Sequence, residues 1–205
     1  MIADILSLSL QHAILVVVAV LCAALAALPA AVWCARHPGA GAYVLGLTDI
    51  FQTIPSLALF GLLLPLPLIG GIGPRLAIFV LFLYALLPIL RNTLLGLEGV
   101  DAEVRESAIA LGMTPAQSLR EVEFPLAAPS ILAGLRIATV TTIGTATVAA
   151  AIGAGGLGVL LYRGLATIET GLLLAGALPA ALMALAADRL FHWVETKYVS
   201  ARRRS

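Results

Sequence analysis

The residues of this chain that are able to do chemistry lie in one short charged segment and at a few polar positions inside long apolar runs. The charged segment, DAEVRESAIALGMTPAQSLREVEFP at Asp101–Pro125, holds seven of the 23 charged residues. Within an apolar run, Asp49 is followed by Gln52, Thr53 and Ser56. Polar groups in such a run either line a water-filled path or bond to a neighbouring helix.

Signatures of nucleotide chemistry are missing or incomplete. The chain has no GxxxxGK[ST] motif, so we expect no ATP site of the P-loop type. GAGGLG at 153–158 matches GxGxxG, but a dinucleotide site needs a preceding strand and an acid about 20 residues later. A long apolar run precedes it here, so we expect a flexible outer turn instead.

Cysteine and histidine are too sparse and too scattered to form a disulfide framework or a metal site. We expect Cys22 and Cys34 to be small packing residues. The histidines are expected at interfacial helix ends: His12, His37 and His192. We predict no catalytic residues, no metal site and no cofactor in this chain.

The composition places these residues in a membrane protein. Of the 205 residues, 61% are hydrophobic and 11% are charged, and the mean hydropathy is +1.06. A soluble domain carries about 25% charged residues, and a surface this poor in charge does not stay in water. The net charge of +1 excludes an electrostatic footprint for nucleic acid.

Several apolar runs are long enough to cross a membrane, which takes about 20 residues of helix for about 30 Å of hydrocarbon. The sequence predicts five spanning helices in one membrane domain covering 1–205, at 13–35, 43–68, 76–97, 126–152 and 171–191. The glycine-rich stretch before the last of them leaves a sixth span open. The predicted fold class is all-α integral membrane, with one long connection at 98–125.

The distribution of Lys and Arg sets the predicted orientation, because basic residues concentrate on the cytoplasmic side. With the N-terminus outside, ten of the twelve fall on or towards the inner side, and only Arg75 and Arg163 remain outside. Arg91 and Arg136, inside spans, are expected to snorkel towards inner helix ends. Segment 98–125 and the C-terminus are then cytoplasmic.

The charged segment is patterned as two short amphipathic helices. Asp101 is the predicted N-cap of the first, and Val104, Ala108 and Leu111 form an apolar stripe at i, i+4 and i+7. Gly112 suits the left-handed position that follows a helix. We expect a partner to cover the stripe, since a solvated loop of frayed helices would leave it in water.

A second short helix is predicted at TPAQ, with Thr114 as N-cap, Pro115 as the first helical residue and Gln117 completing a capping box. The pair Phe124–Pro125 is expected to end it. The outline is that of a DNA-binding helix-turn-helix, but the segment has five acidic and two basic residues. Phosphate would repel it, so we reject that function.

The segment resembles the EAA loop of ATP-binding-cassette importer permeases. That pattern is Glu-Ala-Ala, three residues, Gly, nine residues, Ile, one residue and Leu-Pro, and ESAIALGMTPAQSLREVEFP keeps its spacing. The departures are Ser for Ala, Val for Ile and Phe for Leu. The candidate coupling residues, with Leu111 from the stripe, are Glu106, Ser107, Ala108, Gly112, Val122, Phe124 and Pro125.

The resemblance implies a type I importer fold in which 98–125 is a cytoplasmic coupling loop. Its first helix would dock on a separate ATPase subunit, which holds ATP and Mg, and would pass ATP-driven closure to the spans. The resemblance also implies a second permease subunit, identical or homologous, and an extracytoplasmic solute-binding protein. The location would be a bacterial inner membrane, in contact with lipid.

Three further stretches resemble the osmoprotectant branch of these permeases, which moves glycine betaine, carnitine or choline. They are DIFQTIPSLALFG at 49–61, LFLYALLPILRNT at 81–93 and IGAGGLG at 152–158. The alternatives are a similar importer for another solute such as an amino acid, a secondary transporter, or a membrane scaffold. A secondary transporter would carry ion-binding carboxylates in several spans and would need no docking helix.

The polar positions of the second span suggest a translocation path. Asp49, Gln52, Thr53 and Ser56 are predicted to share one helix face, and Pro55 to bend the helix and free a backbone carbonyl. We expect these residues to line or gate the path. The alternative is that Asp49 and Gln52 bond between helices.

The run TVTTIGTAT at 139–147 is rich in small and hydroxyl residues, which let membrane helices pack closely and hydrogen-bond to one another. We expect Thr141, Gly144 and Thr145 to pack against another helix. A seam between two permease copies, or the solute path, are the alternatives.

Overall fold

The structure is a computed structural model that describes residues 2–67 and 69–202, with side chains described as far as Tyr198. Every regular element in these ranges is helical, which confirms the predicted all-α fold. The elements are α1 (Ile2–Arg36), α2 (Pro38–Thr53), α3 (Ser56–Leu63), α4 (Pro74–Glu98), α5 (Ala102–Ala110), α6 (Pro115–Gln117), the π-helical η1 (Ser118–Glu123), α7 (Phe124–Ala146), the 3-10 helix η2 (Val148–Ile152), α8 (Gly158–Thr167) and α9 (Thr170–Arg202).

Four stretches of the described chain are single helices long and apolar enough to cross a membrane: Ile2–Arg36, Pro74–Glu98, Pro115–Ala146 and Thr170–Tyr198. The pair α2 and α3 is apolar enough as well, but it bends by 98° between Thr53 and Ser56. Counted as one broken span, it brings the total to five. The glycine-rich stretch leads only to α8, whose ten residues rise about 15 Å, half of the hydrocarbon thickness.

Two predicted boundaries are wrong. The second span was expected as one helix over 43–68, whereas its helix starts at Pro38 and breaks after Thr53; position 68 lies outside the described residues. Phe124–Pro125 was expected to end a helix, whereas the helix continues from Pro115 to Ala146. The π-helical turn η1 explains this, because its wider i→i+5 spacing accommodates a proline ring that would clash with a carbonyl in an α-helix.

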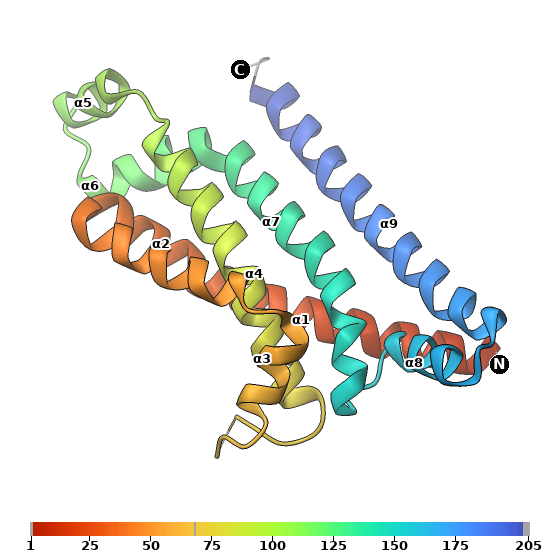
Figure 1. Cartoon of the computed structure of the whole chain (residues 1–205). Helices are drawn as coiled ribbons and strands as arrows, with labels where there is room; N and C mark the ends of the chain where they lie inside the picture. The colour runs from red at the N-terminus through yellow and green to blue at the C-terminus, as the bar shows by residue number, and fades with distance from the viewer. Residues whose placement is uncertain (1, 68, 203–205) are drawn as a thin grey trace.

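The helices are arranged around α1, α4 and α7 (Figure 1). α4, α7 and α9 run side by side, while α1 crosses beneath them and α8 lies near its N-terminal end. α5 and α6 project at one end of the bundle, where α4 finishes and α7 begins. The charged segment 98–125 is therefore a distinct hairpin at one end of the bundle.

The packing of α1 on α4 depends on small side chains. Ala19, Ala23, Ala27 and Ala31 recur at every fourth position and are fully buried. Such a stripe lets two membrane helices approach closely, because apolar side chains gain no hydrophobic energy by leaving lipid and association relies on close contact.

The crossing of α4 with α7 depends on one glycine from each helix. A Cβ on Gly96 would lie 2.8 Å from the Cβ of Ser130, and a Cβ on Gly134 would lie 2.7 Å from the Cβ of Asn92. Neither distance is compatible with a side chain at the glycine. These two contacts fix where α7 crosses α4, and so where the hairpin at its N-terminal end sits.

Candidate functional site

The first helix of the hairpin, α5, is terminated at both ends as its sequence predicts. The Asp101 side chain accepts a hydrogen bond of 3.0 Å from the backbone N–H of Glu103. At the other end Gly112 has φ of +87°. The N–H groups of Gly112 and Met113 donate to the carbonyls of Ile109 and Ala108, which is the Schellman arrangement.

The second helix of the hairpin, α6, is also capped at its N-terminal end. The Thr114 hydroxyl accepts from the Gln117 N–H, and the Gln117 side chain accepts from the Thr114 N–H at 2.8 Å. This confirms the capping box, with Pro115 in the first helical turn. Two capped helices joined through a left-handed glycine form a stiff element rather than a frayed loop.

An apolar groove runs between α5 and η1. A cavity of about 400 Å³ is lined by Val104, Ala108 and Leu111 of the predicted stripe, by Met113 and by Val122 of η1. Its polar lining residues are Asp101, Glu103 and Ser107. Ala108 forms its floor at 4% exposure, while Leu111 stands at the rim at 81%. Among the predicted coupling residues, Glu106 and Ser107 are exposed on α5, and Phe124 and Pro125 are half-buried at the start of α7.

A buried carboxylate anchors the hairpin to the membrane helices. The Glu123 side chain is only 4% exposed and forms ion pairs with Arg36 of α1 at 2.9 Å and with Arg105 of α5 at 3.4 Å. It also accepts from the Ser118 hydroxyl at 3.3 Å, and Arg105 donates to the Leu97 carbonyl of α4 at 3.1 Å. We call Arg36, Arg105, Ser118 and Glu123 the anchor cluster.

Sequence reasoning missed this cluster. Glu106, one of the predicted coupling residues, is exposed and makes no ion pair or side-chain hydrogen bond within the described part of the chain. The available signal was the position of Glu123 between two apolar residues of the motif, Val122 and Phe124. A carboxylate that is buried together with such neighbours requires cationic partners.

The break between α2 and α3 is held by hydrogen bonds to α4. Gln52 Nε2 donates to the Tyr84 carbonyl at 2.8 Å. That carbonyl lacks a helical partner because Pro88, four residues later, has no N–H. The Tyr84 hydroxyl in turn donates to the carbonyl of Ile54, at the break itself.

A second proline on a spanning helix also frees a backbone carbonyl, and a tyrosine of a neighbouring helix donates to it. Pro129 leaves the Pro125 carbonyl of α7 without its helical partner, and the Tyr198 hydroxyl of α9 donates to it at 3.2 Å. The Tyr198 hydroxyl thus takes the place of the missing N–H and ties the end of α9 to the start of α7.

Asp49 is bridged to α4. Both its carboxylate oxygens accept from Arg91 Nη2, at 2.8 and 2.9 Å, and the two side chains are about half exposed. Arg91 therefore pairs with an acid rather than only snorkelling to the helix end. Within this single chain Asp49 and Gln52 bond between helices, the alternative left open by the sequence.

The predicted shared face of the second span is only partly formed. Thr53 hydrogen-bonds its own helix at Ile50 O, 2.7 Å away, and it lies on α2 together with Asp49 and Gln52. Ser56 lies on α3, beyond the 98° bend, so it does not share their face. Pro55 stands at the break, as its missing N–H predicts.

The threonines of α7 bond to their own helix. Thr141 donates to Ile137 O at 2.8 Å and Thr145 donates to Thr141 O at 3.0 Å. Gly144 has open space where a Cβ would be, and Thr141 is exposed. Thr142, Ile143 and Ala146 of the same turns are buried, whereas the face with Thr141 and Gly144 is uncovered in the described chain. That face remains available to the two alternatives, a second permease copy or the path.

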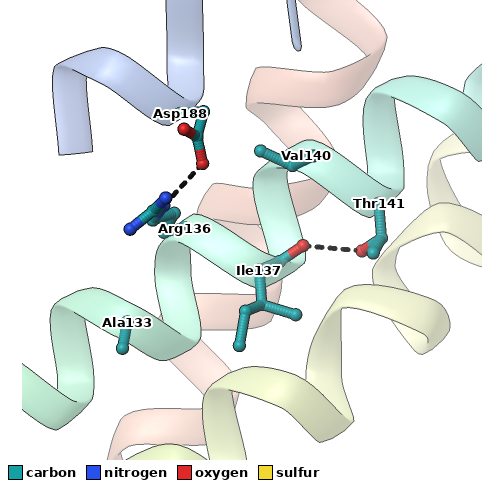
Figure 2. Close-up of a pocket in the computed structure, with 6 residues that line it drawn as sticks. All are labelled: Ala133, Arg136, Ile137, Val140, Thr141 and Asp188. Atoms are coloured by element: carbon teal, nitrogen blue, oxygen red, sulfur yellow. Dashed lines mark hydrogen bonds and ion pairs between the residues drawn. The ribbon is translucent and has the colours of Figure 1, made fainter. Parts of the chain in front are cut away.

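A mostly apolar cavity lies beside an ion pair that joins α7 to α9 (Figure 2). Arg136 of α7 donates through Nε to Asp188 of α9 at 2.6 Å, and each side chain is about one-third exposed. Arg136 is thus paired, and it does not act solely as a snorkelling residue. The cavity measures about 380 Å³, and its lining is Ala133, Arg136, Ile137, Val140, Thr141 and Asp188.

The glycine-rich turn that follows α7 packs against α1 at His12. His12 is fully buried, which corrects its predicted interfacial position, and its Nε2 donates to Ile143 O at 3.0 Å. That carbonyl belongs to the last turn of α7, where no helical N–H remains for it. A Cβ on Gly156, which has φ of +76°, would lie 3.1 Å from His12 Nδ1. The glycines of the turn allow it to pack closely against α1. No strand precedes the turn in the described chain.

The comparisons with known proteins agree with this architecture. Residues 25–200 match the family model described as binding-protein-dependent transport system inner membrane component. The carnitine transport permease protein OpuCD of Listeria monocytogenes is 45% identical over 90% of this chain and 82% of its own length. The osmoprotectant import permease protein OsmW of Salmonella typhimurium is 46% identical over 91% of this chain and 87% of its own length.

Solved structures show the same fold. An inward-facing form of the MetNI methionine ABC transporter superposes with a TM-score of 0.79 at 26% identity, covering 95% of this chain and 97% of that chain. An amino acid ABC transporter crystallised with histidines superposes with a TM-score of 0.76 at 19% identity. With the hairpin geometry, these findings identify the chain as a permease subunit of an ABC importer, a member of the binding-protein-dependent transport system inner membrane component family.

Proposed function

We propose that this permease subunit moves a quaternary-ammonium osmoprotectant, namely glycine betaine, carnitine or choline. The identity of 45–46% over some nine-tenths of the chain with the OpuCD and OsmW permeases supports this solute class. The permease protein OpuCD of Bacillus subtilis, whose name includes all three solutes, is 44% identical.

The groove on the hairpin is the proposed docking site for the ATPase subunit. It is mostly apolar and open, and the element that carries it is stiffened by the caps of both helices. This is the single observation that carries the coupling proposal. ATP and Mg²⁺ would bind on that partner.

The anchor cluster is the proposed transmission element. Its buried carboxylate, at the start of α7, connects α5 with the end of α1, and Arg105 connects α5 with the end of α4. A displacement of α5 towards an ATPase would therefore move three spanning helices at their cytoplasmic ends. ATP binding would close two ATPase subunits, the hairpins of two permease copies would follow, and the path between them would open to an extracytoplasmic solute-binding protein.

The proposed orientation has the N-terminus outside. Arg36 and Arg105 meet Glu123 at one end of the bundle, which supports their common placement on the cytoplasmic side. The C-terminal Arg203 and Arg204, also expected there, lie outside the described residues. Cysteine accessibility at Ser107 and Gly171 in whole cells and inverted vesicles would test this orientation.

The function is tested by purification of the chain with its ATPase subunit and reconstitution in lipid. ATPase activity is then measured with the solute-binding protein loaded with glycine betaine, carnitine, choline or methionine. We expect stimulation by at least one of the first three and none by methionine. Stimulation by methionine alone would instead establish the amino acid importer, and failure to bind any ATPase subunit would refute the coupling role.

A further inference from the structure

We infer that the cavity between α7 and α9 is a solute site for zwitterions, in which Arg136 receives the carboxylate and Asp188 the cationic head. The inference rests on the proposed function, and it concerns residues that neither the coupling loop nor the bend of the second span includes. Figure 2 shows Arg136 and Asp188 pointing towards each other, with Ile137, Val140 and Thr141 beside them on α7.

The first observation is the unused hydrogen-bonding capacity of Arg136. A guanidinium has five N–H donors in a planar fork. Only Nε–H has a partner, Asp188 Oδ1, and within the described residues the two terminal amino groups have none. In a spanning helix such donors require water or a ligand, because hydrocarbon supplies no acceptor.

The second observation is the make-up of the cavity wall. Its 380 Å³ is within the usual range for small-molecule sites, about 300–1,000 Å³. Ala133, Ile137 and Val140 make it mostly apolar, and the ion pair and the Thr141 hydroxyl are its polar groups. An apolar pocket with a few convergent polar groups is the usual composition of a ligand site.

The third observation concerns the hydrogen bonding of the Asp188 carboxylate. One of its oxygens accepts from Arg136 Nε and the other has no hydrogen-bond donor in the described chain. The carboxylate therefore keeps a negative edge for a quaternary ammonium group. The Thr141 hydroxyl gives its proton to its own helix, so only its lone pairs face the cavity.

The chemistry of this pair separates the solutes named above. Glycine betaine and carnitine carry a carboxylate that fits a guanidinium fork in bidentate fashion, whereas choline carries none. A charged hydrogen bond of this kind contributes roughly a factor of 10 to 100 in affinity. Loss of the fork should weaken the two zwitterions and spare choline.

The experiment measures direct binding of labelled glycine betaine and choline to the intact permease–ATPase complex in nanodiscs, without receptor or nucleotide. For Arg136→Gln we expect the Kd of glycine betaine to rise at least tenfold, with choline unchanged or tighter. The Arg136→Lys variant keeps the positive charge but loses the planar fork of N–H donors, so the Kd of glycine betaine should rise by an intermediate amount. Equal changes for both solutes, no change for either, or no saturable binding of glycine betaine to the unaltered complex would overturn the inference.

A charge exchange distinguishes a binding role from a purely structural one. The double variant R136D/D188R keeps an ion pair between α7 and α9 while moving the fork to the other helix. We expect normal abundance in the membrane and persistent loss of glycine betaine binding. Restored glycine betaine binding in the double variant would show that the pair only holds the two helices together. ATPase activity stimulated by the choline-loaded receptor reports separately on the proposed function, since it needs the coupling loop and not the fork.

Discussion

Glu123 lies between two arginines from different helices, with Oε1 2.9 Å from Arg36 Nη2 and Oε2 3.4 Å from Arg105 Nε. The carboxylate is 4% exposed, whereas the two arginine side chains are 40% and 33% exposed. The acid is thus the buried centre of the cluster, and each arginine reaches it from a more exposed position. A single residue of the hairpin joins α5 to the end of α1.

We expect Glu123→Gln to uncouple the transporter. The neutral amide loses both ion pairs, which costs about 2 kcal/mol once the partial exposure of the two arginines is taken into account. Solute uptake per ATP hydrolysed should fall severalfold, and protease cleavage within 98–125 should increase. Glu121→Gln is the matched control, because Glu121 is an exposed acid two residues away. Identical behaviour of the two variants would refute the anchoring role.

Gly112 should tolerate asparagine far better than valine. Its φ of +87° is unfavourable for a β-branched residue, at a cost of about 1–2 kcal/mol, while space around it is open. Gly112→Val is therefore expected to insert normally and to lose coupled uptake, whereas Gly112→Asn should retain most of it. Membrane abundance by immunoblot and uptake of labelled glycine betaine provide the two measurements. Full uptake with valine at this position would contradict the coupling assignment.

Asp49→Ala should reduce transport more than it reduces protein level. The change removes the bridge to Arg91 at a half-exposed position, where an ion pair contributes little to stability, about 0–1 kcal/mol. The exchange D49R/R91D restores the bridge with reversed polarity. If the exchange variant is as abundant as the unaltered protein but does not recover uptake, the acid itself serves the path. If Asp49→Ala lowers only the abundance of the protein, Asp49 is structural.

The two glycines of α7 should respond differently to leucine. Gly134→Leu places a side chain 2.7 Å from the Asn92 Cβ and 2.9 Å from the Pro88 carbonyl, so we expect loss of several degrees in thermal stability or failure to accumulate. Gly144→Leu meets open space in the single chain and should accumulate normally. If a second permease copy covers this face, Gly144→Leu will reduce dimer formation, which crosslinking or native mass spectrometry detects. An unaltered dimer together with reduced uptake would assign the face to the path.

The sequence by itself determined the membrane class, the hairpin and its capping. These features depend on hydrophobic runs of a given length and on local hydrogen bonds, such as Thr114 with Gln117 and the left-handed Gly112, which are encoded within a few residues. The position of Pro55 likewise predicted a bend, because a missing N–H has a local consequence.

Only the tertiary structure decided how the charged and polar groups are paired. Glu123 with Arg36, Asp49 with Arg91, and Arg136 with Asp188 join residues 87, 42 and 52 positions apart, and nothing local indicates which acid a given arginine will meet. The same holds for Tyr84 at the broken helix and for His12 beneath the glycine-rich turn. In a medium without water a polar group gains most from a protein partner, and which partner it finds depends on how the helices cross.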